Sequence, residues 1–202
     1  AFSSPKGVAV DGAGNMLISD YDNDTIRKIV IATSAVTTLF GMTYSRYDRD
    51  GTGAAAVFYT PSGVTLDGAG NLFVAETNGE TVRKVVIATG AVTTLAGSYS
   101  GTGSTDGTGS AARFNHSHRL AADGAGNLFV VDTNNHTIRK VVIATGDVTT
   151  LAGPPGLSGS TDGTGAAAGF SSPEGVAVDG AGNLFVADTG NSTIRKVVIA
   201  TG

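Results

Sequence analysis

Three histidines have the residue type and spacing best suited to metal or ligand chemistry in this chain. His116, His118 and His136 lie close together in the sequence, and they are all the histidines it has. Three imidazoles can hold a zinc ion and leave a fourth coordination position open. Arg119 follows directly, where similar segments of the chain have glycine. The pattern allows two interpretations: a ligand-binding patch of His116, His118, Arg119 and His136, or a metal site made by the three histidines.

The equivalent segments elsewhere in the chain add no further histidine to this group. Lys6, Ser62 and Glu174 align with His118. We therefore favour the ligand-binding patch, with no metal or other cofactor, and keep the three-histidine metal site as the alternative.

Four arginines, each followed by lysine, recur along the chain at the same spacing as four carboxylates. One interpretation is a ring of guanidinium groups for an anionic ligand. The other is an ion pair within each repeated unit, of little energetic value at a surface. We favour the structural ion pairs, which are Asp20 with Arg27, Glu76 with Arg83, Asp132 with Arg139, and Asp188 with Arg195.

Two weaker patterns concern loops. Asp50, Asp106 and Asp162 each begin an Asp-Gly-Thr-Gly segment, but one carboxylate per loop is too few oxygen ligands for calcium. An Asx-turn or a cap of a following short helix is the better interpretation. Tyrosines concentrate in the first part of the chain and could form a sugar- or peptide-binding rim, although a packed loop is favoured; they are Tyr21, Tyr44, Tyr47 and Tyr59.

The elements that position these residues follow from an internal repeat. Phe2, Phe58, Phe114 and Phe170 are spaced 56 residues apart, and an Asp-Gly-Ala-Gly-Asn string recurs with the same period. A period of this length indicates supersecondary units that bury their faces by stacking on one another. The sequence thus predicts one repeat domain over residues 1–202, with units 1–56, 57–112, 113–168 and 169–202.

The third unit reads as four strands, at residues 120–123, 127–132, 137–143 and 147–152. Hairpin-length connections predict an antiparallel meander. The apolar runs barely alternate, which is typical of strands covered on both faces. Such a sheet at a constant period predicts an all-β fold, a propeller blade packed between blades. The connection at 153–174 has room for one helical turn, and we expect the recurring phenylalanine to pack between blades.

The last unit resembles the NHL repeat. The resemblance rests on residues 173–179 (Pro-Glu-Gly-Val-Ala-Val-Asp), 182–189 (Gly-Asn-Leu-Phe-Val-Ala-Asp-Thr), Asn191 and 194–197 (Ile-Arg-Lys-Val), and it extends to all four units. The resemblance implies a β-propeller, most often six-bladed. The tandem units with their long connections are similar to those of bacterial multi-repeat proteins that are often exported. Family members that act as lyases use histidines and a metal near the pore, but with ligands from several blades.

The strand count departs from a complete ring. The sequence predicts three full blades and three strands of a fourth, which lacks its outer strand. We expect a partial ring that completes itself as a homodimer of about eight blades, or that belongs to a larger propeller. The predicted function is a non-enzymatic binding and assembly scaffold for a protein or glycan ligand; the alternative is a metal-dependent lyase using the histidine site.

Composition narrows the function classes further. The net charge is −4 and no basic stripe with interleaved aromatic residues occurs, which argues against nucleic-acid binding. The sequence has no apolar run of about 18 residues, so no membrane span is predicted. There is no cysteine, so a thiolate nucleophile or a disulfide framework is excluded. The resemblance implies an extracellular or periplasmic location.

Overall fold

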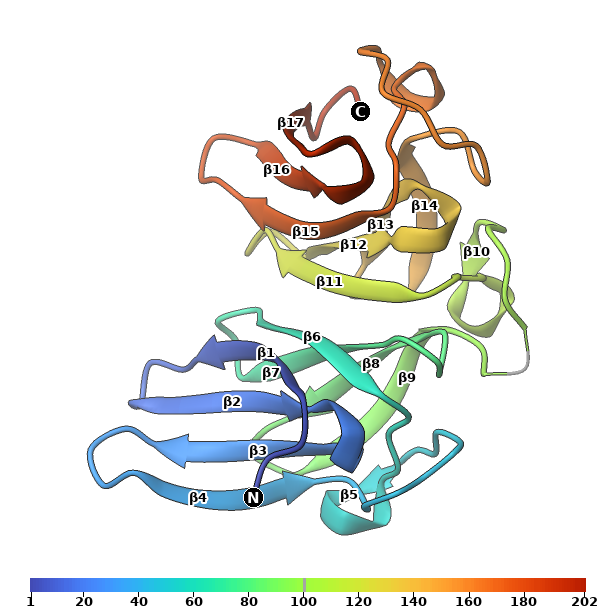
Figure 1. The fold of residues 1–202 in the computed structure, drawn as a ribbon. Coiled ribbons are helices and arrows are strands. Elements are labelled where there is room, and N and C mark those ends of the chain that lie inside the picture. The colour runs from blue at the N-terminus through green and yellow to red at the C-terminus, as the bar shows by residue number, and fades with distance from the viewer. Residues whose placement is uncertain (100) are drawn as a thin grey trace.

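The computed structural model describes residues 1–99 and 101–202 as four small antiparallel sheets arranged as blades of a β-propeller. The blades follow one another along an open arc, with the two termini at its opposite ends (Figure 1). Blade 1 comprises β1 (Pro5–Val10), β2 (Asn15–Asp20), β3 (Thr25–Val30) and β4 (Ala35–Phe40). The predicted all-β propeller fold is confirmed.

The other blades repeat this meander with additions and one omission. Blade 2 contains β6 (Pro61–Leu66), β7 (Asn71–Glu76), β8 (Thr81–Val86) and β9 (Ala91–Gly97). Blade 3 contains β11 (Ser117–Ala122), β12 (Asn127–Asp132), β13 (Thr137–Val142) and β14 (Asp147–Ala152). In the described part of the chain, blade 4 has three strands, β15 (Pro173–Val178), β16 (Asn183–Asp188) and β17 (Thr193–Val198).

The connections between blades contribute a short fifth strand that the sequence did not predict. β5 (Gly51–Thr52) pairs with β9 of blade 2, and β10 (Gly107–Thr108) pairs with β14 of blade 3. The predicted unit boundaries at 56/57 and 112/113 therefore cut through segments that belong to the following blade. Each connection continues into the predicted single helical turn, a 3-10 turn at η2 (Gly53–Ala55), η3 (Gly109–Ala111) and η5 (Gly165–Ala167).

The tight turns form because an aspartate satisfies the backbone of its own loop. In blade 3, the Asp123 carboxylate accepts N–H groups of Ala125 at 2.8 Å and Asn127 at 3.0 Å, while Gly126 has φ 98°. An L side chain rarely adopts that φ, so the glycine is required there. Further 3-10 turns at η1 (Tyr21–Asn23), η4 (Thr133–Asn135) and η6 (Thr189–Asn191) connect the second and third strands of blades 1, 3 and 4.

The core lies between the blades. Phe114, fully buried, packs in one cluster with Phe73 and Val82 of blade 2 and with Leu128 and Val141 of blade 3. Phe58 and Phe170 occupy the same position at the other two junctions. The predicted packing of this phenylalanine between blades is confirmed. Each contributes about 1.5–3 kcal/mol through burial of its apolar surface.

The first strands of neighbouring blades approach closely at a glycine. A Cβ on Gly63 would lie 2.7 Å from the carbonyl oxygen of His118 and 2.8 Å from Cα of Arg119. Backbone atoms cannot yield at such distances, so glycine is needed for β6 to lie against β11. This approach places β11 directly against β6 of the preceding blade. No helix in residues 1–99 or 101–202 is long and apolar enough to cross a membrane.

Candidate functional site

The three histidines do not come together in the structure. The His116 backbone N–H donates to Oε2 of Glu80 at 2.7 Å, and His116 Nδ1 lies 3.5 Å from Oε1 of the same carboxylate. His136 Nδ1 accepts the Ser172 N–H at 3.0 Å, at the junction of blades 3 and 4. His118 lies on β11. Among the described residues no three histidine, aspartate or glutamate side chains form a metal-binding group, so the geometry gives the alternative metal site no support.

His118 and Arg119 lie on the first strand of blade 3 among groups of both charges. Burial lowers the pKa of the His118 imidazole; Glu174 opposes this effect, whereas the nearby Arg119, Lys6 and His116 add to it. Arg119 Nη1 donates to the Ser62 carbonyl at 3.2 Å and Nη2 to the Lys6 carbonyl at 2.8 Å. Arg119 therefore ties the first strands of blades 1, 2 and 3 together, and a ligand-binding role for it stays a prediction.

Glu80 makes the stability of the junction between blades 2 and 3 depend on pH. Burial raises the pKa of this carboxyl to about 7, although the His116 N–H opposes the shift. Between about pH 4.5 and 7 the folded chain keeps a proton that the unfolded chain has lost, so this contribution to stability falls as pH rises. Glu80→Gln, which carries no ionisable proton, should remove that decline.

The expected difference is measured by denaturant unfolding at several pH values. Near pH 4 the wild type and Glu80→Gln should be about equally stable, and near pH 8 the variant should be more stable by at most about 3 kcal/mol. Parallel pH profiles of the two proteins would contradict this assignment.

The recurring arginines and carboxylates form ion pairs in all four blades. Their N–O distances are 3.0 Å for Asp20 with Arg27, 3.0 Å for Glu76 with Arg83, 2.8 Å for Asp132 with Arg139, and 3.5 Å for Asp188 with Arg195. The expectation that such pairs lie at a surface was wrong. Arg83 and Arg139 are fully buried. The connection and the phenylalanine that precede each blade lie against its arginine.

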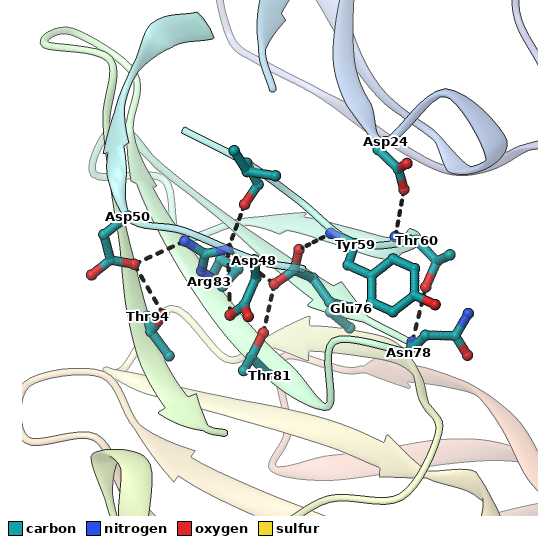
Figure 2. Close-up of polar contacts among 12 residues, drawn as sticks. Asp24, Asp48, Asp50, Tyr59, Thr60, Glu76, Asn78, Thr81, Arg83 and Thr94 are labelled. Atoms are coloured by element: carbon teal, nitrogen blue, oxygen red, sulfur yellow. Dashed lines mark hydrogen bonds and ion pairs between the residues drawn. The ribbon is translucent and has the colours of Figure 1, made fainter. Parts of the chain in front are cut away.

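Each buried guanidinium also binds the connection that precedes its blade. Arg83 donates to Asp50 at 2.8 Å and to the Val57 carbonyl at 3.1 Å, as well as to Glu76 (Figure 2). Its Cζ lies 5.5 Å from the centre of the Phe58 ring. Burial alone would lower the pKa of Arg83, but Glu76 and the nearby aspartates raise it, so the guanidinium stays charged.

Asp106 and Asp162 play the role of Asp50 in blades 3 and 4. They lie 2.8 Å from Arg139 and 2.7 Å from Arg195, respectively. The Asp-Gly-Thr-Gly aspartates are therefore second partners of the arginines, rather than only turn or cap residues. The shared 56-residue period of these aspartates and arginines was the signal that could have revealed this. Because the guanidiniums are engaged within the fold, the structure does not present them as an open ring for an anionic ligand.

A different group of side chains lines a groove on the loops of blades 1 and 2. The groove has a volume of about 490 Å³, and its lining residues are Asp22, Asp24, Tyr44, Ser45, Arg46, Tyr59, Thr60 and Asn78. The Asp24 carboxylate is held by the N–H groups of Ser45 and Thr60, both at 2.8 Å. Burial raises the pKa of Asp24, and these two hydrogen bonds oppose the shift. We call these eight residues the tyrosine groove.

Comparisons with known proteins agree with the repeat pattern. A family model described as NHL repeat matches residues 170–197. The chain is 32% identical over 170 residues to "Protein SUPPRESSOR OF QUENCHING 1, chloroplastic" of Arabidopsis thaliana, covering 80% of this chain and 16% of that protein. It is 34% identical over 157 residues to human "NHL repeat-containing protein 2", covering 72% of this chain and 22% of the relative. The chain thus spans less than a quarter of the length of either relative.

A solved structure shares the fold. An auxiliary nutrient binding protein from Bacteroides ovatus superposes with a TM-score of 0.76 at 21% identity, over 96% of this chain and 48% of that one. At this identity the likeness concerns the arrangement of blades alone.

Proposed function

The chain is an NHL-repeat β-propeller arc, and from this premise we propose that it is a non-enzymatic binding and assembly scaffold. Each of its two end blades accepts a further blade, which a second copy of the chain supplies. The observation that carries the proposal is that both end faces expose apolar side chains whose counterparts inside the arc are buried.

The outward face of blade 4 is the first of these surfaces. Phe185 is 41% exposed and Ile194 is 71% exposed. Their counterparts in blade 3, Phe129 and Ile138, are completely buried because Phe170 and the rest of blade 4 cover them. The outward face of blade 4 therefore carries the apolar side chains of an internal junction, but no following blade covers them in the structure.

The outward face of blade 1 is the second surface. Val8 is 59% exposed and Val10 is 60% exposed, whereas Val64 and Leu120, the counterparts of Val8, are 8% and 5% exposed. Phe2 also lies on this side, where its ring faces the Arg27 guanidinium at 5.0 Å, as the internal phenylalanines face theirs.

The internal junctions define what fits these two faces. At the junction of blades 3 and 4, Phe170 packs with Phe129, Val131 and Ile138. Phe2 of a second copy is the equivalent of Phe170. The equivalents of its three partners on blade 4 are Phe185, Ala187 and Ile194. The outward face of blade 1 of one copy thus matches the outward face of blade 4 of another copy in its side chains.

Geometry favours a closed pair over an open chain. Blade 4 has three strands, so its face, about five residues deep, has roughly 240 Å², and a junction on it buries about 480 Å². Two arcs related by a two-fold axis form two junctions and bury roughly 950 Å², close to the value of about 1,000 Å² expected of a biological interface. The result is a ring of about eight blades, whereas an open spiral gains only one junction per added chain.

Two observations favour binding over catalysis. The recurring charged groups are engaged in ion pairs within the blades, and His136 contacts a different blade junction from His116. Two of the similar proteins are named as NHL repeat-containing and as nutrient binding, and neither name denotes an enzyme.

Light scattering after size-exclusion chromatography tests the assembly. We expect the chain at micromolar concentration to have twice its mass of 20.1 kDa. Ile194→Glu places a carboxylate in the proposed junction and should yield the monomer mass, because a buried unpaired charge costs several kcal/mol.

Leu157→Glu is the matched control, since Leu157 is 65% exposed and lies on the connection between blades 3 and 4, next to Gly156, whose N–H donates to the Asn135 carbonyl of blade 3. Its mass should remain that of the dimer. A wild-type monomer, a mass that keeps increasing with concentration, or a dimer unaffected by Ile194→Glu would each overturn the closed pair.

A further inference from the structure

The tyrosines of this chain gather around one pair of blades. All five lie in the first 99 residues, as Tyr21, Tyr44, Tyr47, Tyr59 and Tyr99. The near-identical later units have small residues at equivalent positions, such as Thr133 for Tyr21, Gly156 for Tyr44 and Asn115 for Tyr59. The blade architecture therefore does not require these aromatic rings.

Contacts among the tyrosines fix one wall of the tyrosine groove. The rings of Tyr59 and Tyr99 meet edge to face, with centroids 6.0 Å apart and planes at 67°. The Tyr99 hydroxyl donates to the Arg46 carbonyl at 2.6 Å, which joins the exit loop of blade 1 to blade 2. Figure 2 shows the Tyr59 ring beside Thr60 and Asn78, and the Tyr59 backbone N–H donates to Glu76 at 2.7 Å.

Tyr44 presents its ring to solvent from an unfavourable backbone conformation. It is 82% exposed, and its φ is 61°. The equivalent Gly156 has φ 78°, so the turn of the repeat sets this backbone conformation. The Tyr44 ring on this turn does not pack into the core and is available to contact a ligand.

The polar groups of the groove include both donors and acceptors. Asp22 and Asp24 provide carboxylate oxygens, Arg46 provides a guanidinium, and Asn78 provides an amide. Asp24 is fixed in place by Ser45 and Thr60, and the Asn78 N–H donates to the Thr60 hydroxyl at 2.9 Å. The volume of about 490 Å³ falls in the range of roughly 300–1,000 Å³ usual for small-molecule sites.

We propose that the tyrosine groove binds a neutral saccharide of one or two rings. A sugar ring offers an apolar C–H face to the exposed Tyr44 ring, and its hydroxyls can donate to Asp22 and accept from Arg46 and Asn78. A quaternary ammonium ion also suits tyrosines beside carboxylates. Arg46, however, places a positive charge in the groove, and both oxygens of Asp24 already accept backbone N–H groups. The proposal rests on the proposed binding role of the chain, but not on closure of the ring.

Tyrosine fluorescence provides the test, because the chain has no tryptophan to obscure it. The probes are glucose, galactose, mannose, N-acetylglucosamine, maltose, cellobiose and lactose, each titrated to about 10 mM and confirmed by calorimetry. At least one should bind, and Tyr44→Ala should weaken its affinity by about tenfold or more. Tyr44→Phe retains the ring and should keep the affinity within about twofold.

The exposure of Tyr44 means that its replacement leaves the fold intact, and an unchanged unfolding midpoint verifies this. Failure of every probe to bind, or binding indifferent to Tyr44→Ala, would overturn the saccharide site. So would Tyr44-dependent binding of tetramethylammonium or a tyrosine-rich peptide in place of the sugars. The Ile194→Glu monomer should bind sugar with wild-type affinity, so failure of the assembly and failure of this site give different results.

Discussion

Replacing Arg139 by alanine is expected to lower the free energy of unfolding by about 3–5 kcal/mol, the usual cost of removing one partner from a buried ion pair. Arg139 is fully buried and donates to Asp132 and Asp106, both at 2.8 Å, and to the Arg113 carbonyl at 2.9 Å. Its removal leaves the Asp132 carboxylate buried without a counter-charge. Denaturant unfolding monitored by circular dichroism measures the loss.

Arg27→Ala is the matched control within the same chain. Arg27 pairs with Asp20 at 3.0 Å and donates to the Ala1 carbonyl, but its side chain is 15% exposed. Water can therefore reach the vacated site, and the expected loss is about 1–2 kcal/mol. Equal losses of unfolding free energy in Arg139→Ala and Arg27→Ala would show that burial does not determine how much the ion pair stabilises the blade.

The strand spans illustrate how much of the fold local chemistry determines. The predicted spans 127–132 and 147–152 coincide with β12 and β14, because each follows a turn with a glycine at positive φ, Gly126 at 98° and Gly146 at 74°. β11 instead begins at Ser117, three residues before the predicted start. A bulge between Ser117 and Leu120 interrupts its pairing, and the polar residues there hid the strand from an apolar pattern.

The features that were missed depend on contacts far apart in sequence. Asp106 and Arg139 are separated by 33 positions, and only the path of the connection along the outer edge of blade 3 brings them together. The histidines show the reverse case. They are close in sequence, but His116 meets Glu80 of the preceding blade, whereas His136 meets Ser172 of the next. In a repeat fold each loop belongs to a junction, so proximity along the chain does not imply a shared site.

Replacing Phe114 by alanine should cost about 3–5 kcal/mol, since the ring fills the junction between blades 2 and 3. The cavity cannot collapse readily, because backbone encloses the ring: a Cβ on Gly97 would lie 3.0 Å from the ring edge and 2.2 Å from the Glu80 carbonyl oxygen. Thermal and denaturant unfolding should both show the loss. A change below about 1 kcal/mol would mean that the blades do not depend on this ring.

Phe2 occupies the same repeat position, but it lies on the outward face of blade 1 with no preceding blade in the structure. In an isolated arc Phe2→Ala should therefore cost much less than Phe114→Ala, about 1 kcal/mol. If a second copy covers that face, part of the binding free energy of the pair is lost as well, and the penalty becomes dependent on protein concentration. Unfolding midpoints of wild type and Phe2→Ala, measured across a hundredfold range of concentration, distinguish these cases. The wild-type midpoint should rise with concentration more steeply than that of the variant. If neither midpoint changes with concentration, no second copy covers the end face.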